Sequence, residues 1–198
     1  MTRKVVLMGV VVAVFGTGIY LAAMELFKRS AVVEVGQPAL DFTLQTLTGE
    51  TFRLQDTLGR PVILNFFASW CEPCQQEQPI LQRFEEDYGD SVELVLVDRA
   101  EPPVLVRQFV EQYQVSATVV MDSENRVSKM YQVAGQPETL FIDEQGILRS
   151  HYRGELVDGM LEEMLRQFST TTSLAAGPAS SFLSGRVHEW PGRIWPWL

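Results

Sequence analysis

Two short runs of nearly continuous apolar, β-favouring residues lie in the middle of the chain, at 62–67 and 92–97. Such runs predict strands buried on both faces of a sheet, and segments with apolar residues at helical spacing alternate with them. The expected order is a hairpin over 40–55, a strand over 62–67, a helix over 74–88, a strand over 92–97, a helix over 105–113, a strand over 118–121, a short helix over 127–131, a hairpin over 139–152 and a helix over 156–168. This order predicts an α/β domain in which a mixed central sheet carries helices on both faces.

An uncharged, mostly apolar segment of 20 residues, 5–24, lies near the amino terminus. At a rise of about 1.5 Å per residue it crosses a hydrocarbon core of about 30 Å, so it predicts one transmembrane helix, with residues 1–30 as an uncleaved membrane anchor. A cleaved signal peptide and a soluble helix are the alternatives, but signal peptides have a shorter apolar core. Because a large domain after an anchor is translocated largely regardless of its charge, we expect the following domain on the extracytoplasmic side of the cell membrane.

The carboxy-terminal residues 169–198 are rich in Ser, Thr, Gly, Ala and Pro and show no sustained period, which predicts a flexible tail. Two tryptophans within 193–198 favour contact with a membrane surface or a partner, although an unstructured end is the simpler interpretation. The expected organisation is therefore an anchor over 1–30, a folded domain over 31–168 and a tail over 169–198.

The chain of 198 residues carries 16 basic and 25 acidic groups, a formal net charge of −9. Residues 36–168 hold ten of the basic and twenty-two of the acidic groups, so the expected domain is strongly acidic. Nucleic-acid binding is excluded because phosphates require clustered Lys and Arg, which the sequence lacks. With 46% apolar and 21% charged residues the chain has the composition of a globular protein, and its two cysteines are too few for a disulfide framework.

Both cysteines lie in the segment Trp70-Cys71-Glu72-Pro73-Cys74, where a predicted strand is followed by a helix. Thiols at i and i+3 on the first turn of a helix lie within the Cα separation of about 4.4–6.8 Å that a disulfide requires, so this pair can open and close. Cys71 is nearest the positive end of the helix dipole, which favours its thiolate, so Cys71 is the expected attacking cysteine. Cys74, one turn further along, is the expected resolving cysteine.

Neighbouring residues modify the cysteine pair. Glu72 adds negative charge and Pro73 lacks an N–H, so both weaken the stabilisation of a thiolate and favour a reducing couple. Glu77, three residues after Cys74, is a candidate proton acceptor and donor for that thiol, with a solvated helix carboxylate as the alternative. Trp70 is expected to shield the site and offer an apolar docking surface to a client protein, with a plain core tryptophan as the alternative.

The segment Gly135-Gln136-Pro137 precedes a predicted strand, where the proline is a candidate cis peptide. Backbone groups beside Gln136 and Pro137 are then free to pair with an extended client segment, although a loop proline alone is a commoner pattern. No metal or cofactor is expected, because His151 and His188 are the only histidines and lie far from the cysteines in the sequence. A metal shared between two chains, or two inert core cysteines, are the remaining alternatives for the pair.

These segments together resemble the thioredoxin superfamily and, within it, the membrane-anchored TlpA/ResA/CcmG-like thiol-disulfide oxidoreductases. The resemblance covers residues 36–168 and rests on the opening segment 35–42, on 65–74 (NFFASWCEPC) and on 136–143 (QPETLFID). It implies a thioredoxin-like fold with an N-terminal β-hairpin and a central insertion of one helix and one strand.

The resemblance also implies roles for individual residues. Cys71 matches the family's nucleophile, Cys74 its resolving cysteine, Pro137 its cis proline and Glu77 its acidic residue after the second cysteine. One departure from cytoplasmic thioredoxin is Asn65, which stands where that protein has a buried aspartate. An amide cannot accept the proton of the resolving thiol, so Glu77 is the candidate for this role.

The resemblance implies a dedicated extracytoplasmic reductant, as proteins of this family are. They reduce protein disulfides, such as those between the haem-binding cysteines of apocytochrome c, and are re-reduced by a membrane thiol carrier. One alternative is a peroxiredoxin-like peroxidase, but peroxidases place a threonine three residues before their reactive cysteine, where this chain has Ala68. A second alternative is a non-catalytic assembly factor that uses the fold as a scaffold.

Overall fold

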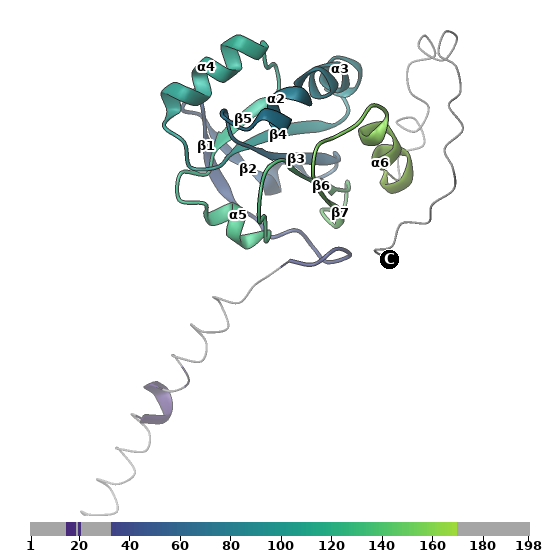
Figure 1. The fold of residues 1–198 in the computed structure, drawn as a ribbon. Helices are drawn as coiled ribbons and strands as arrows, with labels where there is room; N and C mark the ends of the chain where they lie inside the picture. Colours follow the sequence, from purple (N-terminus) through teal and green to yellow (C-terminus); the bar gives the residue numbers. More distant parts are fainter. Residues whose placement is uncertain (1–14, 19, 21–32, 170–198) are drawn as a thin grey trace, which may run out of the picture.

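The computed structural model describes residues 15–18, 20 and 33–169 (Figure 1). Most of the predicted anchor over 1–30 lies outside the described residues, as does the predicted tail over 169–198 apart from its first residue. Among the helices of the described residues, none has both the length and the apolar character needed to cross a membrane.

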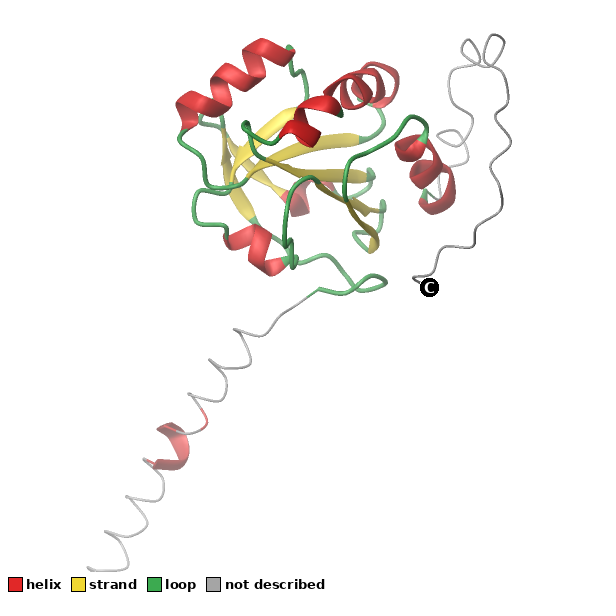
Figure 2. Ribbon diagram, viewed as in Figure 1, coloured by secondary structure: helices red, strands yellow, loops and turns green. Residues whose placement is uncertain are grey.

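Residues 33–169 contain one mixed sheet of seven strands, in the spatial order β2-β1-β5-β4-β3-β6-β7 (Figures 1 and 2). The strands are β1 (Thr43–Thr46), β2 (Thr51–Arg53), β3 (Val62–Phe67), β4 (Glu93–Asp98), β5 (Thr118–Met121), β6 (Glu138–Ile142) and β7 (Leu148–Arg153). The helices are the 3-10 turn η1 (Leu54–Thr57) and the α-helices α2 (Glu72–Gln76), α3 (Gln78–Tyr88), α4 (Pro103–Tyr113), α5 (Arg126–Met130) and α6 (Met160–Phe168). The predicted α/β class, the hairpins and the alternation of strands with helices are confirmed.

The three central strands β3, β4 and β5 are parallel, and α3 and α4 form the crossovers between them. The remaining strand pairs are antiparallel: β1 with β2, β1 with β5, β3 with β6, and β6 with β7. Phe67 at the end of β3 is paired with Asp98 at the end of β4. The segments that follow these two residues therefore leave the sheet at the same edge, and this edge carries the cysteines.

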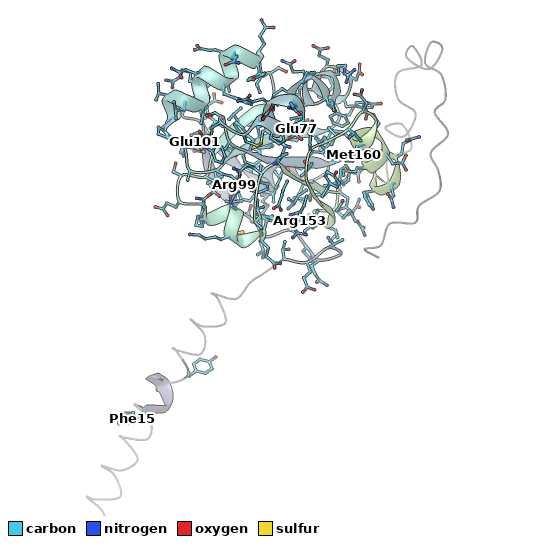
Figure 3. The ribbon with its side chains drawn as sticks, in the orientation of Figure 1. Phe15, Glu77, Arg99, Glu101, Arg153 and Met160 are labelled. Carbon is cyan, nitrogen blue, oxygen red and sulfur yellow. A yellow bond between two sulfur atoms is a disulfide. The ribbon has the colours of Figure 1, made fainter. Side chains whose placement is uncertain are left out.

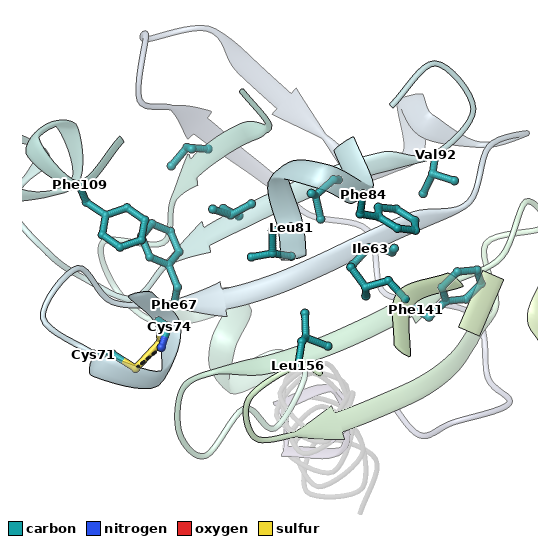
Figure 4. Close-up of a cluster of buried hydrophobic side chains, with 14 of the residues drawn as sticks. Ile63, Phe67, Cys71, Cys74, Leu81, Phe84, Val92, Phe109, Phe141 and Leu156 are labelled. Atoms are coloured by element: carbon teal, nitrogen blue, oxygen red, sulfur yellow. Dashed lines mark hydrogen bonds between the residues drawn. A yellow bond between two sulfur atoms is a disulfide. The ribbon is translucent and has the colours of Figure 1, made fainter. Parts of the chain in front are cut away.

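Strand β3 lies between two apolar clusters because successive side chains of a strand point to opposite faces. Ile63 and Phe67 belong to the cluster that α3, α4 and α6 cover (Figure 4). Val62, Leu64 and Phe66 belong to the cluster on the other face, which includes side chains of α5 and of the β1–β2 hairpin. All of β3 is buried, so the predicted central strand covered on both faces is confirmed.

The helix predicted over 74–88 is divided into α2 and α3, with Glu77 between them. Pro79 has no N–H to donate to the carbonyl of Gln75, four residues earlier, so the helical hydrogen-bond ladder is interrupted there. The division places the Glu77 side chain at a junction between two helices, where it is fully buried.

The helix predicted over 156–168 begins later, at Met160. Gly159 precedes it with a φ of 82°, a left-handed conformation that glycine adopts without steric cost and that a continuous helix excludes. Leu156 is buried in the preceding loop instead, and its backbone N–H contacts the site described below.

Candidate active site

The cysteine pair lies at the turn from β3 into α2. Cys71 is the N-cap residue of α2, and a disulfide joins it to Cys74 with a Cα separation of 5.2 Å (Figure 4). The side chains thus have the pairing that the i, i+3 spacing predicts. Cys74 is fully buried whereas Cys71 keeps 5% of its surface exposed, so Cys71 is the sulfur that a second molecule can reach first.

The start of α2 places a backbone donor at the Cys71 sulfur. The backbone N–H of Cys74 lies 3.3 Å from the Cys71 Sγ and donates to it. A hydrogen bond of this kind, together with the positive end of the helix dipole, favours the thiolate over the thiol once the disulfide is opened. The geometry therefore suits Cys71 to nucleophilic attack.

A cis peptide bond lies opposite the disulfide. The Gln136–Pro137 bond is cis, as the sequence predicts, and it directly precedes β6. The carbonyl oxygen of Gln136 lies 3.8 Å from the Cys71 Sγ. Two segments separated by 65 residues therefore meet at the Cys71 sulfur.

The Glu77 carboxylate is fully buried. Its Oε1 accepts a hydrogen bond from Asn65 Nδ2 at 2.8 Å, and its Oε2 accepts one from the backbone N–H of Leu156 at 2.9 Å. Asn65, which the sequence marks as the departure from thioredoxin, also donates to Thr139 Oγ1 at 3.1 Å. A solvated helix carboxylate, the alternative interpretation of Glu77, is therefore wrong.

Burial raises the pKa of Glu77 from 4.5 to about 7. The two hydrogen bonds, from Leu156 and from Asn65, oppose this shift because they favour the charged form, while the nearby carboxylate of Glu155 adds to it. A carboxyl group with a pKa near neutrality can both take and return a proton under ordinary conditions. These properties suit the proton-transfer role that the sequence suggests for Glu77.

Trp70 precedes the reactive cysteine and projects into solvent. Its side chain is 69% exposed, which excludes the plain core tryptophan as an interpretation. A large exposed aromatic residue beside a reactive group is a feature of binding surfaces.

Sequence reasoning missed three polar residues in the segment 98–101, which begins at Asp98, the last residue of β4. Glu101 accepts hydrogen bonds from Ser69, two residues before Cys71, and Arg99 donates to the side chain of Gln136.

Asp98 is fully buried, and this burial raises its pKa to about 7. A hydrogen bond from the Glu101 N–H opposes the shift, and the charges of Glu101 and Asp122 add to it. The signal in the sequence for the position of the segment 98–101 is the pairing of the two buried runs over 62–67 and 92–97, because parallel neighbouring strands end at the same edge of a sheet.

Side chains of His, Cys, Asp and Glu bind a metal ion where several of them converge. Within residues 15–18, 20 and 33–169, no group of three or more such side chains is arranged to hold a metal ion. His151 lies on β7 with its Nε2 2.6 Å from Glu138 Oε2, and His188 lies outside the described residues.

A disulfide at the start of a helix, a cis proline opposite it and a mixed sheet beneath define the class of proteins with a thioredoxin-type dithiol site. The model of the AhpC/TSA family matches residues 35–151. The chain is 33% identical over 141 residues to the thioredoxin-like protein YneN of Bacillus subtilis, covering 70% of this chain and 82% of that protein.

A second relative is the thiol-disulfide oxidoreductase ResA of Bacillus cereus, 31% identical over 144 residues, which are 72% of this chain and 83% of that protein. Among solved structures, a protein described as a thiol:disulfide interchange protein DsbE from Chlorobium tepidum is similar with a TM-score of 0.63 and 29% identity, over 67% of this chain and 96% of that one. The chain therefore belongs to the AhpC/TSA family, and within it is a thiol-disulfide oxidoreductase.

Proposed function

We propose that the protein is an extracytoplasmic reductant of protein disulfides, held at the cell membrane by residues 1–30 and carrying its dithiol on the domain over 31–168. The observation that carries the proposal is the Cys71–Cys74 disulfide, with the Cys71 sulfur facing the carbonyl of Gln136 and Glu77 enclosed nearby. Its client class is proteins with an accessible disulfide.

The proposed reaction begins with both cysteines reduced. The Cys71 thiolate attacks one sulfur of the client disulfide, so a Cys71–client bond forms, the client S–S bond breaks, and the second client sulfur leaves and takes up a proton. Glu77 then accepts the proton of Cys74, whose thiolate attacks the Cys71 sulfur and releases the client as a dithiol. Two electrons pass to the client, and the Cys71–Cys74 disulfide remains, to be reduced again by a membrane thiol carrier.

Two features favour reduction over oxidation as the direction. Glu72 is exposed at the start of α2 and places a negative charge beside the pair, and Pro73 at the next position has no N–H to offer a thiolate. Both leave the reduced form less stabilised, which makes the couple a better electron donor.

For the client, we propose apocytochrome c, whose haem-binding cysteines must be reduced before haem attachment. The support is the similarity to ResA and the strongly acidic domain, which suits a basic partner.

The test of this client offers the reduced protein two substrates under the same conditions: an oxidised Cys-x-x-Cys-His segment of apocytochrome c, and insulin. We expect the apocytochrome segment to be reduced faster. Equal or slower reduction contradicts this client, and turnover of hydrogen peroxide by the purified protein would favour the peroxidase instead.

The exposed Trp70 gives a prediction about client docking. We expect Trp70→Ala to raise KM for a protein disulfide about tenfold while kcat changes less than twofold, because a lost aromatic contact of about 1.4 kcal/mol corresponds to a factor of ten. Steady-state kinetics with insulin measure this. Leu58→Ala is the control, since Leu58 is 56% exposed and precedes β3 at the opposite edge of the sheet. An unchanged KM in Trp70→Ala contradicts the docking role.

A further inference from the structure

The segment 98–101, which begins at the last residue of β4, contacts both sides of the active site. It begins beside the end of β3, where Asp98 is paired with Phe67 and the backbone N–H of Arg99 donates to the carbonyl of Phe67 at 3.2 Å. Ala100 has a φ of 60°, a left-handed conformation that turns the chain sharply between Arg99 and Glu101. Figure 3 labels Arg99 and Glu101 in this region.

Glu101 holds the segment that leads into the cysteines. Its Oε2 accepts from the backbone N–H of Ser69 at 2.5 Å, and its Oε1 accepts from Ser69 Oγ at 2.6 Å. Glu101 is only 7% exposed and is itself fixed, because its backbone N–H donates to Asp98 Oδ2 at 3.0 Å. Two hydrogen bonds to one carboxylate define the position of Ser69, two residues before Cys71.

Arg99 holds the other side. Its Nη1 donates to the side-chain oxygen Oε1 of Gln136. Gln136 is also the residue whose backbone carbonyl lies 3.8 Å from the Cys71 Sγ and whose peptide bond to Pro137 is cis. Arg99 therefore fixes Gln136, the residue whose carbonyl faces the Cys71 sulfur.

We propose that the segment 98–101, here called the bracket, sets the position of Cys71 relative to the cis-proline segment, with Arg99 and Glu101 as positioning residues for the disulfide exchange. A client that pairs with the backbone beside Pro137 must present its sulfur in line with Cys71, so a small displacement of one segment against the other slows the reaction. Charged groups suit this task because their hydrogen bonds are stronger and more directional than neutral ones. The inference rests on the proposed attack by Cys71.

The test on Arg99 is a double-mutant cycle with Gln136, with insulin as the substrate and dithiothreitol as the electron donor. We expect Arg99→Gln to lower kcat/KM about tenfold, mainly through KM, and Arg99→Lys, which keeps the charge and a donor, to stay within about threefold of the wild type. In a Gln136→Ala background the same Arg99→Gln change should alter kcat/KM less than twofold, because Arg99 acts through Gln136. Arg107→Gln, the same change at an exposed position of α4, is the control.

The test on Glu101 uses Glu101→Gln, whose amide can accept only one of the two hydrogen bonds from Ser69. We expect kcat to fall about tenfold with KM changed less than twofold, because Cys71 and not the client-docking segment is displaced. Glu111→Gln on the exposed side of α4 is the matched control. Thermal unfolding of each variant separates misplacement of the site from loss of the fold.

Two outcomes would contradict the proposed positioning role of the bracket. One is kcat and KM within twofold of the wild type in both Arg99→Gln and Glu101→Gln; the other is an equal effect of Arg99→Gln with and without the Gln136 side chain. Failure of the proposed function is separate, since the wild-type protein would then not reduce insulin at all.

Discussion

Replacing Cys71 by serine is expected to lower the rate of protein-disulfide reduction by at least about a thousandfold, as for a lost covalent nucleophile. A hydroxyl at this position stays protonated near pH 7, so the backbone donor at the start of α2 has no thiolate to stabilise. The measurement is reduction of insulin with dithiothreitol as the electron donor. Retained turnover in Cys71→Ser would contradict the assignment of Cys71 as the nucleophile.

Cys74→Ser is the matched comparison, because it removes the same disulfide but leaves Cys71, the more accessible cysteine, in place. This variant should still attack the client and then stop, since no thiol remains to release it. A mixed disulfide between Cys71 and the client should therefore accumulate and appear as a covalent complex on a non-reducing gel. A complex formed by Cys71→Ser instead would exchange the roles of the two cysteines.

Replacing Glu77 by glutamine is expected to lower the rate of client release about a hundredfold at pH 7, the effect of losing a positioned general base. In the wild type this rate should rise with pH up to about 7, as the Glu77 carboxyl loses its proton and becomes able to accept one from Cys74. In Glu77→Gln the inflection near pH 7 should be absent. Rapid-mixing measurements of mixed-disulfide decay between pH 5 and 9 give both quantities.

Glu86→Gln is the control for this experiment, because Glu86 is an exposed residue of α3. A Glu77→Gln protein with the wild-type rate and the wild-type inflection would remove Glu77 from the mechanism. The variant is expected to fold, because Asn65 Oδ1 has no hydrogen-bond partner and a rotated Asn65 amide can accept from the new glutamine N–H.

The same carboxyl group links stability to pH. The pKa of Glu77 is about 7 in the folded protein, whereas its ordinary value is 4.5. Between pH 4.5 and about pH 7 the folded state therefore keeps a proton on Glu77 that the unfolded state has lost. Stability therefore falls as pH rises from about 4.5 to 7 and then levels off, and the raised pKa of Asp98 acts in the same direction. Urea unfolding should show Glu77→Gln to be less pH-dependent, with a gain over the wild type above pH 7 of up to about 3 kcal/mol. An unchanged slope would contradict the raised pKa.

Much of the fold could be predicted because its strongest signals are local. Strand β3 has the bounds of the apolar run over 62–67, and β5 has those of the segment over 118–121, since buried parallel strands need apolar residues on both faces. The cysteine pair was equally accessible, because the geometry of an i, i+3 pair at the start of a helix depends on only four residues.

The parts that could not be predicted depend on contacts between distant segments. Glu77 is buried, and it accepts its hydrogen bonds from Asn65, 12 residues away, and from Leu156, 79 residues away. The hydrogen bonds of Glu101 to Ser69 join residues 32 apart, and nothing in a local pattern distinguishes this carboxylate from the many on the acidic surface. The late start of α6 has a similar cause, since apolar periodicity continues through Leu156 although that residue belongs to a loop.

The reduction potential of the Cys71–Cys74 couple decides which way electrons flow, and therefore whether the protein reduces or oxidises its clients. Equilibration with glutathione or dithiothreitol buffers, read out by alkylation of the free thiols, gives this value. We expect a potential below about −220 mV, nearer to the value of about −270 mV for thioredoxin than to that of an oxidant. A potential near −120 mV, that of the strong oxidant DsbA, would mean that the protein forms disulfides in its clients and would contradict the account.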